Sequence, residues 1–338
     1  MFSPRSLITP RVRRLAEGLF LLGLLIPFTV AIASLSGLGH RWVDVFTHFV
    51  APVLSGTVAV AILFALLRLR RAAVGGAAVC VLLLTALTPQ LAPGGPRPAA
   101  DGETIRLYVA NLYAMNDDVD AMRASIEAAD ADILVLVEFG DAPAAVAEDL
   151  LAGHPYRQVT QRVVRSRDAV RSVIASRHPL SPRAAEDAGR QMAAAEIDTP
   201  IGPIHVVGAH LTRPWPFQFQ WAQLIQGQNL ISHIRNVPEP VVIAGDFNSV
   251  AASRLGRLLR SEGGLVHAPG WPGTWPAALP GPLRMTIDQV YHSPALAVTS
   301  RRLGRSTGSD HRPVIVELAR SDARGQGPVH QASPRPPG

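Results

Sequence analysis

The pattern of hydrophobic positions divides the chain into an apolar first third and a remainder in which apolar and polar runs alternate. Three stretches, residues 18–40, 45–67 and 72–96, lack Asp, Glu, Lys and Arg altogether. An α-helix rises about 1.5 Å per residue, so about 20 residues cross the ~30 Å hydrocarbon core of a bilayer. We therefore predict three transmembrane helices, at about residues 15–39, 45–67 and 72–92, within a membrane anchor of residues 1–92. The alternative, buried helices of a soluble core, requires three consecutive segments without a polar face.

Arginines flank these stretches unevenly. Four precede the first stretch and three lie between the second and the third, at positions 5, 11, 13 and 14 and at positions 68, 70 and 71. Under the positive-inside rule both clusters are cytoplasmic, whereas the connection 41–44, with one base and one acid, is outside. Three spans that start inside end outside, which predicts an extracytoplasmic domain on the cell membrane. Residues 31–33 resemble a signal-peptidase site, and cleavage after Ala33 would leave this placement unchanged.

Composition narrows the partners of the chain. The net charge of +6 and the pI near 10.5 would ordinarily suggest nucleic acid. Residues 1–100 hold nine arginines against two acids, however, and residues 101–320 hold 21 arginines against 23 acids. The basic surplus therefore belongs to the anchor, and nucleic acid is a disfavoured partner. Cys80, the only cysteine, lies in an apolar run, so disulfides do not stabilise an exported domain.

Proline and glycine mark the boundaries of the second region. Four prolines and two glycines within residues 89–100 predict that the third helix ends there and that residues 93–100 form an extended linker. Residues 321–338 have almost nothing apolar to bury and are predicted to be disordered.

Residues 101–320 alternate between short apolar runs and helical periodicity. The candidate strands are 104–112, 132–138, 170–176, 193–197, 204–211, 240–244, 286–291, 297–303 and 314–318. The candidate helices are 119–126, 221–234 and 253–262. Nine strands exceed what one parallel sheet usually holds, so we predict an α/β fold with two stacked mixed sheets and helices outside, a four-layer α/β/β/α sandwich.

The segment Val-Val-Ile-Ala-Gly-Asp-Phe-Asn-Ser, residues 241–249, joins a buried strand to polar chemistry. Positions i and i+2 of an extended backbone share a face, so Asp246 and Asn248 can point into one cavity. An Asx turn that ends a strand is the structural alternative.

A second polar segment, Ser-Asp-His-Arg-Pro at residues 309–313, precedes the last candidate strand. Asp310 and His311 place an acceptor and a titratable donor at a sheet rim. Upstream, Asp288 is the one acid in an otherwise uncharged strand, where it can orient a histidine and stabilise its cation. An edge-strand surface charge is the alternative for Asp288.

Taken in order, these segments resemble the endonuclease/exonuclease/phosphatase superfamily, which includes DNase I, abasic-site endonucleases, neutral sphingomyelinases and inositol polyphosphate 5-phosphatases. The resemblance covers nearly all of residues 101–320. Its motif positions are Asn111, Glu138, His210, Asp246, Asn248, Asp288, Asp310 and His311.

The resemblance implies a metal-dependent hydrolase of phosphoester or phosphoanhydride bonds. Glu138, assisted by Asn111 and Asp310, would hold Mg²⁺ or Mn²⁺, since hard cations prefer oxygen ligands. Catalysis would fall to the remaining five positions: Asp246 as the base for water, Asn248 as its guide, His210 and His311 as donors to the phosphoryl oxygens, and Asp288 as the orienter of His311.

Two departures separate this chain from the nucleases of the superfamily. Abasic-site endonucleases carry an acid two residues after the first-strand asparagine, where this chain has Tyr113, and the basic residues with which they grip duplex DNA have no concentrated counterpart. Trp271 and Trp275 lie in a Pro- and Gly-rich loop that can line a substrate groove or pack as structure.

The layout of three spans followed by this domain resembles the VanJ-type membrane proteins associated with teicoplanin resistance. That resemblance implies the lipid bilayer as a partner and a phosphorylated lipid, such as an undecaprenyl-pyrophosphate-like molecule, as substrate. The alternatives are a cell-surface endonuclease or exonuclease and a non-catalytic envelope-binding module. A nuclease requires an arginine-rich groove around Asp246, whereas a lipid phosphoesterase requires an apolar or mixed rim facing the membrane.

Overall fold

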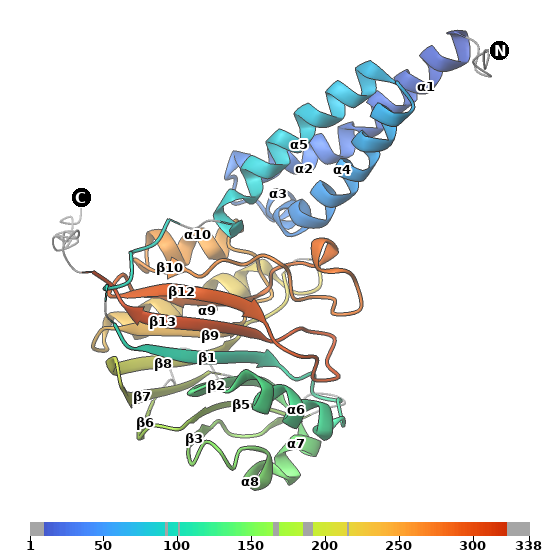
Figure 1. Ribbon diagram of the computed structural model, residues 1–338. Coiled ribbons are helices and arrows are strands. Elements are labelled where there is room, and N and C mark those ends of the chain that lie inside the picture. Colours follow the sequence, from blue (N-terminus) through green and yellow to red (C-terminus); the bar gives the residue numbers. More distant parts are fainter. Residues whose placement is uncertain are drawn as a thin grey trace, which may run out of the picture.

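A rod of helices at the N-terminus is joined end-on to a two-sheet domain (Figure 1). The computed structural model describes residues 10–91, 94–100, 102–164, 169–184, 192–214 and 216–322. Of the predicted disordered tail, residues 323–338 lie outside the described residues. Arg5 also lies outside them.

The rod contains the three predicted spans. Three helical stretches, Arg11–Ser36, Arg41–Leu66 and Arg70–Leu91, are long and apolar enough to cross a membrane. The first is α1 (Pro10–Gly23) and α2 (Leu25–Ser36), the second is α3 (Arg41–Asp44), η1 (Val45–Phe49) and α4 (Val50–Leu66), and the third is α5 (Arg70–Leu91). Many of their large apolar side chains are exposed, as expected of helices that face hydrocarbon.

The linker is more tightly held than its composition suggests. Helix α5 includes Pro89 and ends two residues later, because the loss of one backbone hydrogen bond is tolerated near a helix end. The Ala99 amide then donates to Arg320 (3.0 Å) and the Asp322 amide to Arg97 (2.8 Å). The linker therefore lies against the end of the last strand.

The second region consists of two stacked mixed sheets, which confirms the predicted α/β sandwich. The first sheet has the order β12-β13-β1-β2-β5-β3, with β4 paired to β5, and the second has the order β10-β11-β9-β8-β7-β6. The first comprises β1 (Thr104–Asn111), β2 (Ile133–Phe139), β3 (Tyr156–Val159), β4 (Val163–Val164), β5 (Ala169–Ser176), β12 (Leu296–Leu303) and β13 (Val314–Arg320). The second comprises β6 (Leu180–Arg183), β7 (Ala193–Thr199), β8 (Gly202–His210), β9 (Val241–Asp246), β10 (Val266–His267) and β11 (Asp288–His292).

Helices cover the outer face of each sheet. Met122 and Ile126 of α6 (Val119–Ala129) pack on the first sheet, near α7 (Asp141–Ala145) and α8 (Ala147–Leu150). Leu230 of α9 (Gln220–Arg235) and Leu255 of α10 (Arg254–Ser261) pack on the second. Between the sheets, inward residues of both form one buried apolar cluster that includes Val135 and Val206.

Each of the nine predicted strands corresponds to one of these strands. Four others, β3, β4, β6 and β10, were not predicted. They are two to four residues long, which is too short for an alternating pattern to stand out from a loop.

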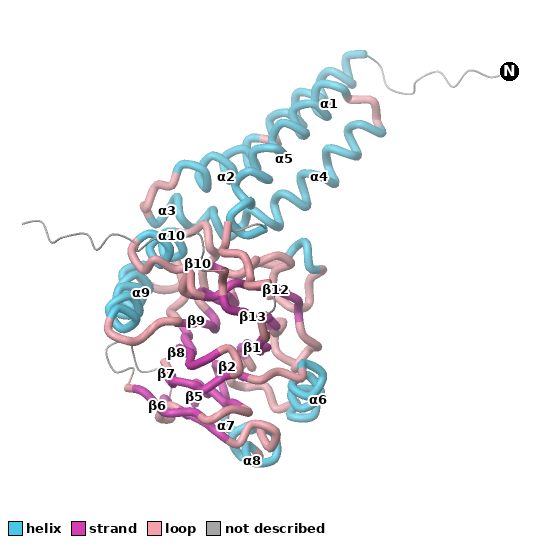
Figure 2. Tube along the Cα trace, turned by 60° about the vertical axis from the view of Figure 1, so that its left-hand side comes forward, coloured by secondary structure: helices cyan, strands magenta, loops and turns pink. Residues whose placement is uncertain are grey.

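The rod contacts the domain through the end where α2 ends and α3 begins. Buried Asp44 accepts from the Arg254 backbone N–H (2.7 Å) and from the Gln220 side chain (3.3 Å), and pairs with Arg257 (3.7 Å). Figure 2 shows α3 beside α10. On the opposite side of this end, the Ser55 hydroxyl donates to Pro282 in η3 (Gly281–Leu283) at 2.7 Å.

Candidate active site

The eight motif residues come from both sheets and meet at one edge of the sandwich. Asn111, His210 and Asp246 are the last residues of β1, β8 and β9, and Glu138 is the penultimate residue of β2. Parallel pairing of β1 with β2 and of β8 with β9 brings these strand ends to the same edge. Asp288 lies directly opposite Asp246 in the β9–β11 register.

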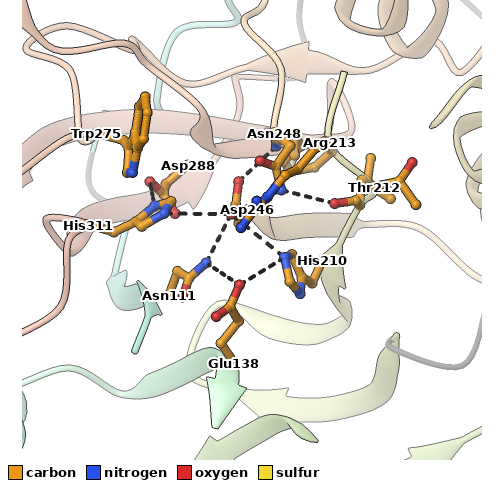
Figure 3. Close-up of polar contacts among 12 residues, drawn as sticks. Asn111, Glu138, His210, Thr212, Arg213, Asp246, Asn248, Trp275, Asp288 and His311 are labelled. Carbon is orange, nitrogen blue, oxygen red and sulfur yellow. Dashed lines mark hydrogen bonds and ion pairs between the residues drawn. The ribbon is translucent and has the colours of Figure 1, made fainter. Parts of the chain in front are cut away.

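Four of these side chains form a compact cluster (Figure 3). The Asn111 Nδ2 donates to Asp246 Oδ2 at 2.9 Å and to Glu138 Oε1 at 3.3 Å. The His210 Nε2 lies 3.3 Å from Glu138 Oε1 and 3.8 Å from Asp246 Oδ2. The carboxylates of Glu138 and Asp246 thus both contact the Asn111 amide and the His210 imidazole.

A buried acid–histidine pair adjoins this cluster. His311 Nδ1 lies 2.8 Å from Asp288 Oδ2, and its other nitrogen, Nε2, lies 3.9 Å from Asp246 Oδ2. The bond to Asp288 fixes the orientation of the ring and leaves Nε2 directed toward Asp246 and the cavity. Asp288 is fully buried beside its partner, so the alternative of an edge-strand surface charge is wrong.

Local backbone geometry directs Glu138 and Asn248 into the site. Both residues have a positive φ, 50° for Glu138 and 47° for Asn248. Residues other than glycine rarely adopt this backbone conformation. Glu138 also lies where the β2–β5 register shifts between Leu136 and Phe139, a bulge that re-aims a side chain. Such strain is typical of functional positions.

Asn248 also closes an Asx-type turn with Asp246. Its backbone N–H donates to Asp246 Oδ1 at 2.7 Å, and its Nδ2 donates to Leu211 at 3.0 Å. The structure therefore contains both the Asx turn and the shared cavity that the sequence offered as alternatives for Asp246 and Asn248. Gly245 precedes them at φ 142°, where a Cβ would stand 2.0 Å from the Ala209 carbonyl oxygen, so a side chain is excluded there.

Burial and neighbouring charge shift the protonation of these groups. Burial raises the pKa of Asp246 to about 7, and the charge of Asp288 adds to the effect. Burial alone would lower the pKa of His311, but the carboxylates of Asp288 and Asp246 hold it at about 10. Burial likewise opposes ionisation of Glu138, yet His210 and the Ala114 N–H lower its pKa overall. At neutral pH His311 is a cation and Asp246 can gain or lose a proton.

The donor set fits a divalent cation at one of two candidate positions. Ligand atoms of Glu138, His210 and Asp246 lie within 4.8 Å of one another, as do those of Asp246, Asp288 and His311. A protonated histidine cannot be a ligand, so the raised pKa of His311 disfavours the second group. The first group offers two carboxylates, which are ligands for hard divalent cations, and an imidazole, which is a ligand more typical of transition metals.

The other two predicted metal residues lie beside the first group and at the mouth of the site. Asn111 directs its amide N–H groups at the carboxylates, while its oxygen accepts from the Tyr113 N–H at 2.9 Å. Asp310 lies half-exposed at the mouth of the site, where its Oδ2 accepts from Trp275 Nε1 at 3.0 Å. Glu138 is the predicted metal residue that lies within the first group.

These residues line a cavity of about 210 Å³ whose walls also come from the rod. Val45, His48 and Phe49 of η1 face the same cavity as Glu138, Asp246, Asn248, Asp310 and His311. Apolar side chains of the domain, Pro214, Phe217, Trp275, Met285 and Ile287, complete much of the wall, and Arg213 is the one arginine among the described residues that line it.

Sequence reasoning missed Arg213 and the three residues of η1. Arg213 follows His210 by three positions, a spacing that could have suggested it. No pattern pointed to η1, because its role depends on how the rod docks. Of the two loop tryptophans, Trp275 lines the cavity and Trp271 packs against the buried cluster of the rod, so both interpretations of that loop apply.

This fold and this constellation define a family of hydrolases. The model of the endonuclease/exonuclease/phosphatase family matches residues 108–311, from within β1 to His311. The chain belongs to that family. Its members are generally hydrolytic and typically depend on divalent metal ions.

Solved structures agree on the fold. An endonuclease/exonuclease/phosphatase from Beutenbergia cavernae DSM 12333 is 22% identical, with a TM-score of 0.50, over 65% of this chain and 72% of that one. A family protein from Leptotrichia buccalis C-1013-b is 14% identical, with a TM-score of 0.50, over 63% of this chain and 98% of that one. A comparison with curated proteins gives no match.

Proposed function

We propose that this chain is a membrane-anchored, extracytoplasmic phosphoesterase that hydrolyses a phosphoester or pyrophosphate bond of a membrane lipid. One observation carries the proposal: the cavity that contains the catalytic carboxylates is walled in part by η1, the segment at the outer end of the membrane helices. A headgroup in the adjacent leaflet would meet the site without leaving the membrane surface.

The composition of the cavity wall favours a lipid over a nucleic acid. A nuclease requires several cationic side chains to neutralise successive phosphates. Here Arg213 is accompanied by apolar groups such as Phe49, Phe217 and Met285. That mixture suits one phosphoryl group attached to a hydrocarbon chain.

The position of the arginines supports an outer location. Arg68 and Arg70 lie at the turn between α4 and α5, the end of the rod farthest from the domain (Figure 1). The Arg13 side chain donates to the Arg68 carbonyl at this end. Under the positive-inside rule that end is cytoplasmic, so the domain at the other end is outside.

In the proposed mechanism, Asp246 takes a proton from the attacking water, whose direction is set by Asn248. Its pKa of about 7 suits a general base near neutral pH. The His311 cation donates from Nε2 to a phosphoryl oxygen, while Asp288 holds the ring. A divalent cation held by Glu138, when bound, would polarise the phosphoryl group.

The full-length chain, reconstituted in vesicles, would be offered a polyprenyl pyrophosphate, a lipid phosphodiester and DNA, with Mg²⁺ or Mn²⁺. We expect release of phosphate or headgroup from a lipid, abolished by EDTA and restored by metal. Asp246→Asn should lower turnover by about 10²-fold or more, the usual effect of removing a positioned base.

Cleavage of DNA with no lipid turned over would make the chain a cell-surface nuclease. Activity that persists unchanged in EDTA would contradict the metal requirement. No turnover of any substrate, with the fold intact, would favour a non-catalytic binding module.

A further inference from the structure

Four large apolar side chains beside the cavity are turned outward. Phe217, Phe219, Trp221 and Ile225 are 75%, 82%, 67% and 51% exposed. They lie in the segment that leads into α9 and on its first turns. We call these four residues the aromatic patch. Scattered single apolar residues are normal on a protein surface, but a contiguous group of this kind usually marks a contact with another apolar phase.

Two glutamine side chains of this segment bond it to backbone groups of the domain. The Gln218 side chain accepts from the Arg213 N–H at 2.7 Å, and buried Gln223 donates to the Thr212 carbonyl at 2.8 Å and to the Phe247 carbonyl at 3.1 Å. These bonds fix the backbone of the segment while the four apolar side chains remain turned outward. The exposure of the aromatic patch is consequently built into the local structure.

The patch lies at the outer end of the rod. Gln220, between Phe219 and Trp221, donates to Asp44 of α3, and Trp221 packs under the Arg254 guanidinium at 5.8 Å. Trp42 and Phe49, on the rod itself, are also exposed at this end. The spans are about as long as a bilayer is thick, so this end lies at the headgroup level, where Trp and other aromatic residues are enriched.

We propose that the aromatic patch binds the surface of the bilayer that the rod crosses, as a second membrane contact. Phe217 both belongs to the patch and lines the cavity, so this contact turns the cavity mouth toward the leaflet. The occupant is the lipid interface, because the patch is continuous with the end of the transmembrane rod. The inference rests on the membrane anchoring proposed above and does not depend on hydrolysis.

A fluorescent label reports the environment of the patch directly. In a Cys80→Ala background, Phe219→Cys would be labelled with an environment-sensitive fluorophore and the full chain reconstituted in phosphatidylethanolamine–phosphatidylglycerol vesicles. The control is Tyr156→Cys, 41% exposed on β3, at the end of the domain away from the rod (Figure 1). Neither position belongs to the catalytic machinery.

We expect the label at 219 to emit at shorter wavelength than the label at 156, and to be quenched at least twofold more by lipids that carry a nitroxide near the headgroup. Equal quenching at both positions, with both labels open to iodide in water, would overturn the proposal. A blue-shifted label at 219 that nitroxide lipids do not quench would also overturn it, because the patch would then be covered by protein.

Discussion

His311 lies between two carboxylates, with Asp288 bound to Nδ1 and Asp246 3.9 Å from Nε2. A cation in this position offsets the repulsion between the acids, which stand opposite each other in adjacent strands. The arrangement is stable only while enough protons are bound. The protonation of this site is therefore linked to the stability of the fold.

In the metal-free protein we predict that thermal stability falls as the pH rises from about 4 to 10. The pKa values of Asp246 and His311 are raised, to about 7 and about 10. A raised folded-state pKa gives stability that is complete below the unfolded-state value and lost as the pH passes the folded value. Asp246 governs the window from about 4 to 7, and His311 the window from about 6.5 to 10. Tryptophan fluorescence during heating in EDTA measures the effect, expected to be several degrees.

Asp246→Asn, which cannot ionise, should flatten the acid half of this profile and narrow the alkaline half, because the Asp246 carboxylate is one of the two that raise the pKa of His311. Added Mg²⁺ or Mn²⁺ should raise the midpoint most at alkaline pH, because a cation replaces the lost protons. A melting temperature that increases from pH 5 to pH 9 in EDTA would show that the pKa shifts run in the opposite direction.

At the scale of single residues, the sequence predicted site residues that lie at the ends of strands. It predicted none of the residues that reach the cavity through contacts between distant parts of the chain. Asp246 and Glu138 follow runs of buried apolar residues, so their position at a sheet edge could be inferred from alternation and length. Arg213 and His48 lie in segments without such a pattern. Their contribution comes from contacts with distant parts of the chain, which no local pattern encodes.

Among the elements, α10 bonds to the rod through Arg254 and Arg257. Its first backbone N–H groups need acceptors. Ser253 supplies one from within the domain, accepting from the Gly256 N–H at 3.1 Å, and Asp44 supplies another from α3. The rod thus provides part of the cap of a helix in the catalytic domain.

Asp44→Ala should loosen the rod from the domain. The change leaves the Arg254 N–H without its acceptor and Arg257 without its carboxylate, a cost of roughly 1–3 kcal/mol for buried groups. We expect faster amide exchange in residues 37–49 and a higher KM, since η1 forms part of the cavity. Exchange mass spectrometry in lipid nanodiscs and steady-state kinetics measure both.

The matched control is Asp141→Ala, an exposed acid that pairs with Arg162 and Arg171 on the far side of the domain. Surface ion pairs are worth about 0–1 kcal/mol, so exchange in residues 37–49 should not change. If Asp44→Ala leaves that exchange at the wild-type level as well, the α3–α10 contact is not what holds the two parts together.

For the molecule as a whole, the proposed topology assigns each connection to one side of the membrane. Alkaline phosphatase fused after Ala100 should be active, because three spans that begin in the cytoplasm end outside. A fluorescent protein that matures only in the cytoplasm should be dark at the same junction and bright when fused after Arg70. The reverse pattern would place the domain in the cytoplasm and make a nucleotide or nucleic acid the first candidate substrate.

The architecture was predictable and the docking was not. Charge-free stretches of sufficient length predict spans, and the alternation of short apolar runs predicts stacked sheets. η1 walls the cavity at the end of the rod where Asp44, a single acid in a short connection, bonds to α10. In the sequence, Asp44 was notable only because its negative charge offsets the positive charge of Arg41 in the connection 41–44.

The clamped linker limits where this protein can act. Residues 97–99 are bonded to the end of the last strand and α3 is bonded to α10, so under the proposed membrane anchoring the active site would stay at one patch of one vesicle or cell. For a lipid substrate, the velocity should follow the mole fraction of substrate within the bilayer, with no dependence on bulk concentration. In a mixture of vesicles with and without enzyme, hydrolysis should stop when the substrate in the accessible leaflet of the enzyme-bearing vesicles is used up. The level of this plateau would give the fraction of vesicles that carry enzyme.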